Sequence, residues 1–247
     1  MNWVREERCL QSEMGIRKLH RLLKPRLEAY QIKIGRDKLF ELCRKHGLLI
    51  VKKTRRCYTT NSNHGFRKHS NLLAGTQVTG PHQAWVGDIT YIRIEGGRFV
   101  YLALLMDAFS RKIIGWNVGQ TLEAEGCINA LKMAIKQLPK GVLPPIHHTD
   151  RGIQYCCNEY NKIITKRGIT LSMTEENHCY ENAMAERLNK TFKYEYHLKK
   201  TCRNLAAVKA IVKQSVNLYN NRRPHVSLGY EFPSVMHQLG VAKEEVA

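Results

Sequence analysis

Residues 84–118 read AWVGDITYIRIEGGRFVYLALLMDAFSRKIIGWNV, and this stretch decides the fold. Three runs within it are rich in β-branched and aromatic residues: 84–94, 99–109 and 112–118. The connections between them, 95–98 and 110–111, are as short as those of antiparallel hairpins. The stretch therefore predicts three consecutive antiparallel strands, and it places Asp88 in the middle of the first one.

The residues that follow alternate between helix and strand patterns. Apolar residues at helical spacing predict a helix at 121–137, and further helices are predicted at 156–167 and 180–197. Short apolar runs predict strands at 145–150 and 168–173. This order of elements is that of the ribonuclease-H-like fold, an α/β (α+β) class with a mixed five-stranded sheet and flanking helices.

The N-terminal end has a different composition. Residues 1–80 carry 18 basic and 6 acidic side chains, which accounts for most of the net charge of +19. Helical spacing predicts helices at 13–24 and 36–46, the first ended or kinked by Pro25 and the second closed by Gly47. Two short helices followed by a basic run resemble a small helix-turn-helix module, although an ordinary helical hairpin has the same pattern.

These patterns divide the chain into four segments. Residues 1–56 are predicted to form a helix-turn-helix-like DNA-binding domain, and 57–80, rich in Asn, Ser, Thr, Gly and His, a linker. Residues 81–200 form the predicted ribonuclease-H-like core, and 201–247 a C-terminal helix and tail. The eight cysteines include no C-x-x-C pair, and no apolar run approaches the ~18 residues of a membrane span. We therefore expect a reduced cytoplasmic chain with no metal finger and no membrane partner.

Three acids fall where a two-metal nuclease needs them. Asp88 lies in an otherwise apolar strand, where burial of an unpaired carboxylate costs several kcal/mol. Asp150 ends the predicted strand PIHHTD, and 35 residues separate it from Glu186 on the last helix. In phosphodiester cleavage, two divalent ions ~3.5–4 Å apart hold the attacking and leaving oxygens, and such ions prefer carboxylate ligands.

Each acid taken alone also has a plainer explanation. Asp88 fits a structural aspartate bonded to backbone N–H groups, and Asp150 fits an Asx turn. Glu186 fits an i,i+4 pair with Lys190 on a solvated face. The predicted helix shows two sides, one polar around Glu186 and one apolar. The polar side carries Asn182, Asn189, Lys190 and Lys193, and the apolar side carries Met184, Leu188 and Phe192.

Five motifs in order are more specific than the three acids. They are WVGDITYI, MDAFSRKIIGW, HHTDRGIQY, SMTEENHCYENAMAERLNKTFKYE and YNNRRPHVSLGYEFP. Together they resemble the OrfB product of the IS3 family of bacterial insertion sequences, which are DDE transposases with a retroviral-type integrase core. Gly87 and Glu181 depart from that pattern, where Thr and Asp are common, but neither replaces a ligand. Asp107 also recurs in such proteins, and we interpret it as structural.

The resemblance implies an enzyme that nicks transposon ends and joins the freed 3′-OH to target DNA. Asp88, Asp150 and Glu186 would be both catalytic and metal-binding, and would hold two Mg²⁺ ions that Mn²⁺ can replace. Basic side chains are expected to contact DNA: Lys52, Lys53, Arg55, Arg56, Lys190, Lys193, Arg222 and Arg223. For the two tail arginines, core packing is the other expected role.

The expected partners are the transposon terminal repeats, target DNA, further copies of the chain, and OrfA or an OrfA-derived fusion part. The expected location is the bacterial cytoplasm, at the nucleoid. Two other functions stay open: a catalytically inactive OrfB that regulates transposition by binding DNA or OrfA, and a ribonuclease-H-like RNA nuclease. The buried acids argue against a pure binding module, and the basic N-terminal segment favours duplex DNA. Net charge by itself also fits a ribosome-associated protein.

Overall fold

The computed structural model describes residues 1–50, 68–175 and 182–244 of the chain. The basic run that was predicted to contact DNA lies outside the described residues: Lys52, Lys53, Arg55 and Arg56. Glu181, one of the two departures from the family pattern, also lies outside them. Among the described helices, none is both long enough and apolar enough to span a bilayer.

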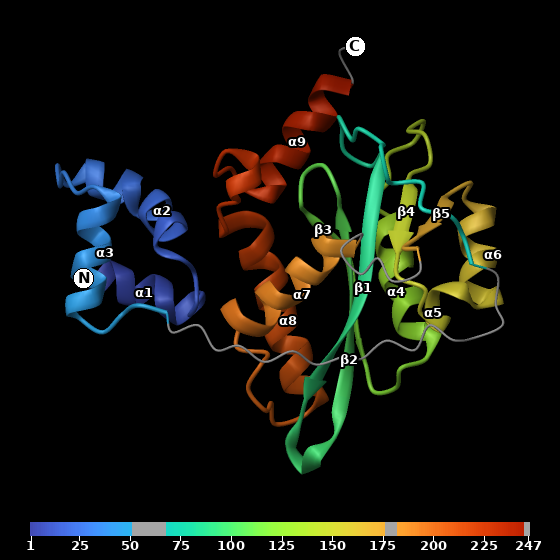
Figure 1. The fold of residues 1–247 in the computed structure, drawn as a ribbon, viewed down its shortest axis with the longest axis horizontal. Helices are drawn as coiled ribbons and strands as arrows, with labels where there is room; N and C mark the ends of the chain where they lie inside the picture. The colour runs from blue at the N-terminus through green and yellow to red at the C-terminus, as the bar shows by residue number, and fades with distance from the viewer. Residues whose placement is uncertain (51–67, 176–181, 245–247) are drawn as a thin grey trace.

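A mixed five-stranded sheet in the order β3-β2-β1-β4-β5 forms the centre of the molecule (Figure 1). Its strands are β1 (Ala84–Arg93), β2 (Phe99–Asp107), β3 (Ile113–Gly119), β4 (Ile146–Thr149) and β5 (Thr170–Met173). The first three pair antiparallel in sequence order, and β4 lies parallel to both β1 and β5. Every predicted strand is present, and the predicted α/β class with a mixed sheet is confirmed.

Helices cover both faces of the sheet (Figure 1). The helices α7 (Ala183–Glu195) and α8 (Leu205–Arg222) pack on one face, and α4 (Ala124–Ile135), α5 (Ile153–Cys156) and α6 (Asn158–Lys166) pack on the other. Side chains alternate along a strand, so Val86 and Ile92 of β1 face α7 while Trp85 faces α4. By the same alternation Asp88 belongs to the α7 face.

The helix predicted at 156–167 is present as α6, and a short helix that was not predicted, α5, precedes it. Cys157 has extended backbone and separates α5 from α6. The side-chain amide of Asn161 donates to the carbonyls of Cys156 and Cys157 at 2.9 and 3.0 Å. A local side chain thus satisfies carbonyl groups that a continuous helix would have used internally.

The N-terminal helices have a small core of their own. They are α1 (Asn2–Leu10), α2 (Ile16–Ala29) and α3 (Arg36–Lys45), and α1 was not predicted. Pro25 was predicted to end or kink the helix, and the first alternative is wrong, since α2 continues to Ala29. The turn beyond the proline is held by Arg26, which bonds Glu6 at 2.7 Å and lies 4.3 Å from the Trp3 ring centroid. Gly47 closes α3 with a φ of 64°, as predicted.

Polar contacts join these helices to the core. Gln11 accepts a hydrogen bond from the Tyr196 hydroxyl at 3.1 Å, and Lys18 lies 3.7 Å from Glu195 at the end of α7. The chain continues beyond α8 through the short turn Val226–Leu228 to α9 (Pro233–Glu244). The described part of the predicted linker, 68–80, has neither helix nor strand and runs beside β5, where the Leu72 N–H donates to Ser172.

Candidate active site

Asp88 and Asp150 are brought together by the pairing of β1 with β4. The parallel pairing of β1 with β4 ends with Val86 opposite His148. The same register, continued by two residues along both strands, places Asp88 beside Asp150. Neighbouring strands lie ~4.8 Å apart, and residues in the same register point to the same face. The two carboxylates therefore sit close together on the side of the sheet that α7 covers.

Few donors from the protein serve these two carboxylates. One oxygen of Asp88 accepts the Ile89 N–H at 2.8 Å, and the other accepts the Asn189 side-chain amide at 2.7 Å. Asp150 accepts the Gly152 N–H at 3.0 Å, which is the Asx turn that its sequence context also suggested. The turn does not exclude a further role, because a carboxylate has about four lone-pair sites.

The electrostatics of the pair are unfavourable to two negative charges. Burial raises the pKa of Asp88 to about 8, helped by the charge of Asp150 and more weakly by that of Glu186, while the two hydrogen bonds oppose the rise. Burial also raises the pKa of Asp150, against the hydrogen bond from Gly152. Adjacent carboxylates in such surroundings lose a proton readily only when a cation compensates the charge.

Glu186 lies in the first turn of α7, at the edge of this pair. Its side chain is 40% exposed and sits 3.3 Å from Lys190, so the i,i+4 pair that the sequence also suggested is present. Within the described ranges, no three His, Cys, Asp or Glu side chains come close enough to enclose a metal ion. The structure thus unites Asp88 with Asp150 and leaves Glu186 within electrostatic reach, paired with Lys190.

Two asparagines complete the surroundings of the acids, and sequence reasoning gave neither a role. Asn189 donates to Asp88, and Asn182 donates to the Gly87 carbonyl at 3.2 Å. Both are buried, and neither side-chain oxygen has a hydrogen-bond partner among the described residues. Buried amide oxygens without partners are suited to a cation or an ordered water. The signal was available, since both share the polar side of the helix with Glu186.

The basic residues predicted to contact DNA differ in their availability. The side chain of Lys190 is 66% exposed, and Lys193 is half-buried on the same helix. Arg222 pairs with Glu7 of α1. Arg223 is buried and holds both oxygens of Glu195, at 2.7 and 2.8 Å. The predicted DNA contact at Arg223 is therefore corrected to packing, because a guanidinium held in this way cannot reach a phosphate.

Gly87, the described departure from the family pattern, is explained by close packing. A Cβ at this position would lie 3.0 Å from the His147 ring and 3.1 Å from Leu105. The buried His147 ring is held by the Tyr160 hydroxyl at 2.7 Å. A larger residue beside Asp88 would therefore have to displace a fixed ring.

Comparison with known proteins identifies the chain. A family model described as the integrase core domain matches residues 78–179, and a second of the same description matches 167–233. The insertion element IS600 uncharacterized 31 kDa protein of Shigella sonnei is 34% identical over 221 residues, which cover 88% of this chain and 80% of that protein. The transposase InsF of insertion sequence IS3A from Escherichia coli K12 is 38% identical over 135 residues, 53% of this chain and 46% of that protein. This chain belongs to the IS3 family of insertion-sequence transposases.

Other relatives and solved structures agree with this assignment. The Shigella sonnei transposase for insertion sequence element IS629 is 31% identical over 221 residues, 89% of this chain and 72% of the relative. The HTLV-2 integrase catalytic core domain, solved with magnesium, superposes with a TM-score of 0.50 at 21% identity, covering 65% of this transposase and 99% of that chain. A chain of the simian T-cell lymphotropic virus intasome superposes with a TM-score of 0.54 at 17% identity, covering 90% of this transposase and 74% of that chain. These likenesses confirm the ribonuclease-H-like fold, and the family makes the protein a DDE-type transposase.

Proposed function

We propose that Asp88, Asp150 and Glu186 are the catalytic and metal-binding residues with which this transposase nicks transposon ends and transfers the 3′-OH strand. The observation that carries the proposal is the pair Asp88 and Asp150, held side by side with raised pKa values and few donors. A carboxylate pair that is costly to ionise is stabilised by cations, and this explains why such a pair is kept in the sheet.

The donors present suit two Mg²⁺ ions, which Mn²⁺ can replace. Carboxylates and amide oxygens are hard ligands. The amide nitrogens of Asn189 and Asn182 contact Asp88 and the neighbouring Gly87, and their side-chain oxygens have no partner among the described residues. The magnesium in the HTLV-2 integrase core supports the choice of ion. Bound divalent ions supply an activated water and stabilise the leaving oxygen. Glu186 would complete the site by exchanging its contact with Lys190 for the ion.

The protein's own groups position the reaction. Asn189 holds one oxygen of Asp88 in place, and Asn182 ties the start of α7 to β1. When Glu186 leaves Lys190, the ammonium becomes available for a DNA phosphate, so metal binding and DNA binding would assist one another. Lys193 and the half-exposed Arg222 would extend the contact, together with the basic run at 52–56.

The partners we propose are the terminal repeats of the element and target DNA, which the net charge of +19 attracts. The simian virus relative was solved as an intasome, which supports assembly of several copies on DNA. OrfA, or an OrfA-derived fusion part, is proposed from the family resemblance. The place of action would be the nucleoid of a bacterial cytoplasm.

A nicking and strand-transfer assay tests the site. Labelled DNA carrying the element's own end is incubated with Mg²⁺ or Mn²⁺, with and without OrfA. Asp88→Asn and Glu186→Gln should abolish 3′-end cutting and leave DNA binding measured in EDTA intact. Glu125→Gln, an exposed acid in the first turn of α4, is the matched control and should cut normally.

The outcomes separate the alternatives. Nicking retained in Asp88→Asn would contradict the site assignment. A wild-type protein that binds the end but never cuts, even with OrfA and Mn²⁺, would support the regulatory hypothesis. Cutting of an RNA–DNA hybrid in preference to duplex DNA would support the nuclease hypothesis.

A further inference from the structure

The tail motif YNNRRPHVSLGYEFP begins in the last turn of α8, and this end of α8 contacts the N-terminal helices. Figure 1 shows α7 and α8 between those helices and the sheet. Arg222 of the motif pairs with Glu7 of α1, whose side chain is only 7% exposed. A buried carboxylate is costly without a partner, so Arg222 explains why α1 carries an acid on its inner side.

A second group of charges lies at Glu195, the last residue of α7. Arg223 of the motif holds both carboxylate oxygens of Glu195, and Lys18 of α2 lies 3.7 Å from one of them. Burial alone would raise the pKa of Glu195, but Arg223 and Lys18 outweigh burial and lower it. The carboxylate therefore stays charged at the point where α2 meets α7.

The interface between the N-terminal helices and the core is polar. The buried apolar residues of these helices, from Val4 to Cys43, form a cluster separate from the two clusters of the core. Beside the charged groups, the fully buried Gln11 accepts a hydrogen bond from the Tyr196 hydroxyl. Charged and polar groups fix the register of an interface more than they strengthen it. These contacts are therefore suited to hold the N-terminal helices in one position.

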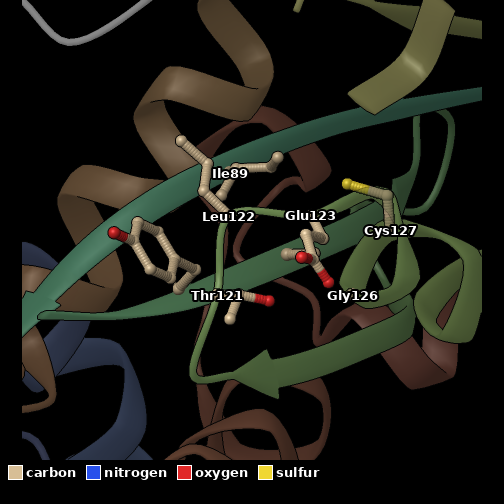
Figure 2. A pocket seen from close by; sticks show the side chains of 8 residues that line it. Ile89, Thr121, Leu122, Glu123, Gly126 and Cys127 are labelled. Atoms are coloured by element: carbon tan, nitrogen blue, oxygen red, sulfur yellow. The ribbon is translucent and has the colours of Figure 1, made fainter. Parts of the chain in front are cut away.

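The N-terminal helices and the acids lie on the same side of the sheet. Figure 2 shows a small pocket on the opposite side, where Ile89 lies near residues at the start of α4. Side chains alternate along β1, so Asp88 points away from that pocket and toward α7. Both α7 and α8 cover this side, and both contact the N-terminal helices. DNA held by those helices can thus reach the acids without crossing the sheet.

The helix α7 connects the interface to the acids. Glu186 lies in its first turn and Glu195 at its end, and the nine residues between these positions rise about 14 Å along the axis. A short helix is rigid, so docking fixes the separation between the N-terminal helices and the acids. Successive phosphates of one DNA strand lie about 3.4 Å apart along the duplex. A shift of the docked helices by that amount would bring the neighbouring phosphate to the acids.

We propose that Arg222 and Arg223 dock the N-terminal helices against α7 and α8, and that this docking selects which phosphate of the transposon end is nicked. The proposal rests on the proposed function, in which the basic N-terminal segment holds DNA and the acids cut it. Both arginines act as positioning residues through their acidic partners, Glu7 and Glu195. The tail motif thereby sets where the transposase cuts, and the acids determine that it cuts.

The test reverses one charge at the interface and leaves the acids untouched. Glu7→Arg places a like charge against Arg222. Glu41→Arg is the matched control, because it adds the same charge at an exposed position of α3 whose partner, Lys38, lies on the same helix. The double variant Glu7→Arg with Arg222→Glu restores opposite charges. Lys18→Met breaks the contact with Glu195 independently and keeps the apolar stem of the lysine.

Two measurements on the full chain separate docking from catalysis. Energy transfer between fluorophores at the exposed positions Glu28 of α2 and Lys209 of α8 reports docking, without DNA or metal. Nick positions are mapped to single nucleotides on labelled DNA that carries the element's own end, with OrfA and Mg²⁺. Thermal melts show whether each variant is folded.

We expect Glu7→Arg and Lys18→Met to reduce energy transfer, to lower nicking at the wild-type phosphate by up to about 100-fold, and to produce nicks at neighbouring phosphates. Glu41→Arg should match wild type in both measurements, and the double variant should restore energy transfer and nick position. Variants that lose energy transfer but nick only at the wild-type phosphate would overturn the proposal. Unchanged energy transfer in both folded variants would overturn it as well. A failure of the proposed function is distinct, because it would abolish nicking at every phosphate in the wild-type protein.

Discussion

Two aspartates of the sheet, Asp107 and Asp88, show what distinguishes a structural carboxylate from one that serves chemistry. Asp107, at the end of β2, is fully buried and accepts the His82 N–H at 2.7 Å, the Ser110 N–H at 2.7 Å and the Ser110 hydroxyl at 2.6 Å. Burial alone would raise the pKa of Asp107, but its contacts with His237, Ser110 and His82 outweigh burial and lower it.

At Asp88 the effect of burial on the pKa outweighs that of the hydrogen bonds. It receives two hydrogen bonds, one of them from the next residue along the chain, and its nearest charged neighbour is another carboxylate. Its pKa rises to about 8 where that of Asp107 falls. The protein itself satisfies Asp107 and leaves Asp88 unsatisfied, so burial of a carboxylate indicates function only where donors are few.

The largest difference between the two is expected in folding stability. Asp107→Asn should lower the free energy of unfolding by about 3 kcal/mol, because its NH₂ would replace one carboxylate oxygen and face an N–H donor, of His82 or of Ser110, with which it cannot bond. Asp88→Asn should leave metal-free stability unchanged or increase it, since it removes an unfavourable charge. Urea unfolding in EDTA measures both values. Equal losses in the two variants would contradict the comparison.

A smaller difference is expected in metal binding. At about 100 times its dissociation constant, Mn²⁺ should stabilise the wild-type protein by about 2.7 kcal/mol, because it binds only the folded site. The increment should vanish in Asp88→Asn and persist in Asp107→Asn, measured by thermal melts with and without Mn²⁺. An increment that survives in Asp88→Asn would place the ion elsewhere.

The pH dependence of stability should differ in sign. The stability linked to Asp88 is complete below the ordinary pKa of 3.8 and is lost as pH rises through about 8. That linked to Asp107 is complete above 3.8 and is lost as pH falls through its lowered pKa. Each slope is at most about 1.4 kcal/mol per pH unit. Urea unfolding in EDTA at several pH values should show a flatter profile above pH 4 in Asp88→Asn than in wild type.

The smallest effect concerns Glu186, which is neither buried like Asp107 nor crowded like Asp88. Its exposed pair with Lys190 should contribute only about 0.3–0.5 kcal/mol, so Lys190→Ala changes stability very little. The same variant should weaken DNA binding and reduce its salt dependence, if the lysine contacts a phosphate. A double-mutant cycle with Glu186→Gln measures the pair, and a coupling well above 1 kcal/mol would show that it is structural.

The fold and the acid pair were predictable because the deciding signals are local. Alternation along 84–94 marks a strand and puts Asp88 on a definite face, and the strand-ending position of Asp150 marks the sheet edge. The assignment of α7 to the sheet followed from its apolar stripe, which includes the buried Leu188 and Phe192.

The remaining features depend on partners that are distant in sequence. Glu7 is buried in α1 because Arg222 pairs with it, and Arg223 is buried because Glu195 holds it. No local pattern predicts such pairs. The place of α1 against α8 was therefore not foreseen, and Arg223 was predicted to contact DNA because its partner Glu195 was not recognised. The same reason explains why α2 continues past Pro25. The contact of Arg26 with Glu6 of α1 stabilises the following turn and overrides the tendency of a proline to end a helix.

The register between β1 and β4 has a consequence for how the chain length can vary. Insertion or deletion of one residue in either strand would turn its aspartate to the opposite face or move it out of line with the other. The connection between α4 and β4 carries no such constraint, and its Leu143 is 84% exposed. Length differences among members of this family are therefore expected to collect in that connection, and a reporter peptide inserted there should leave the transposase active.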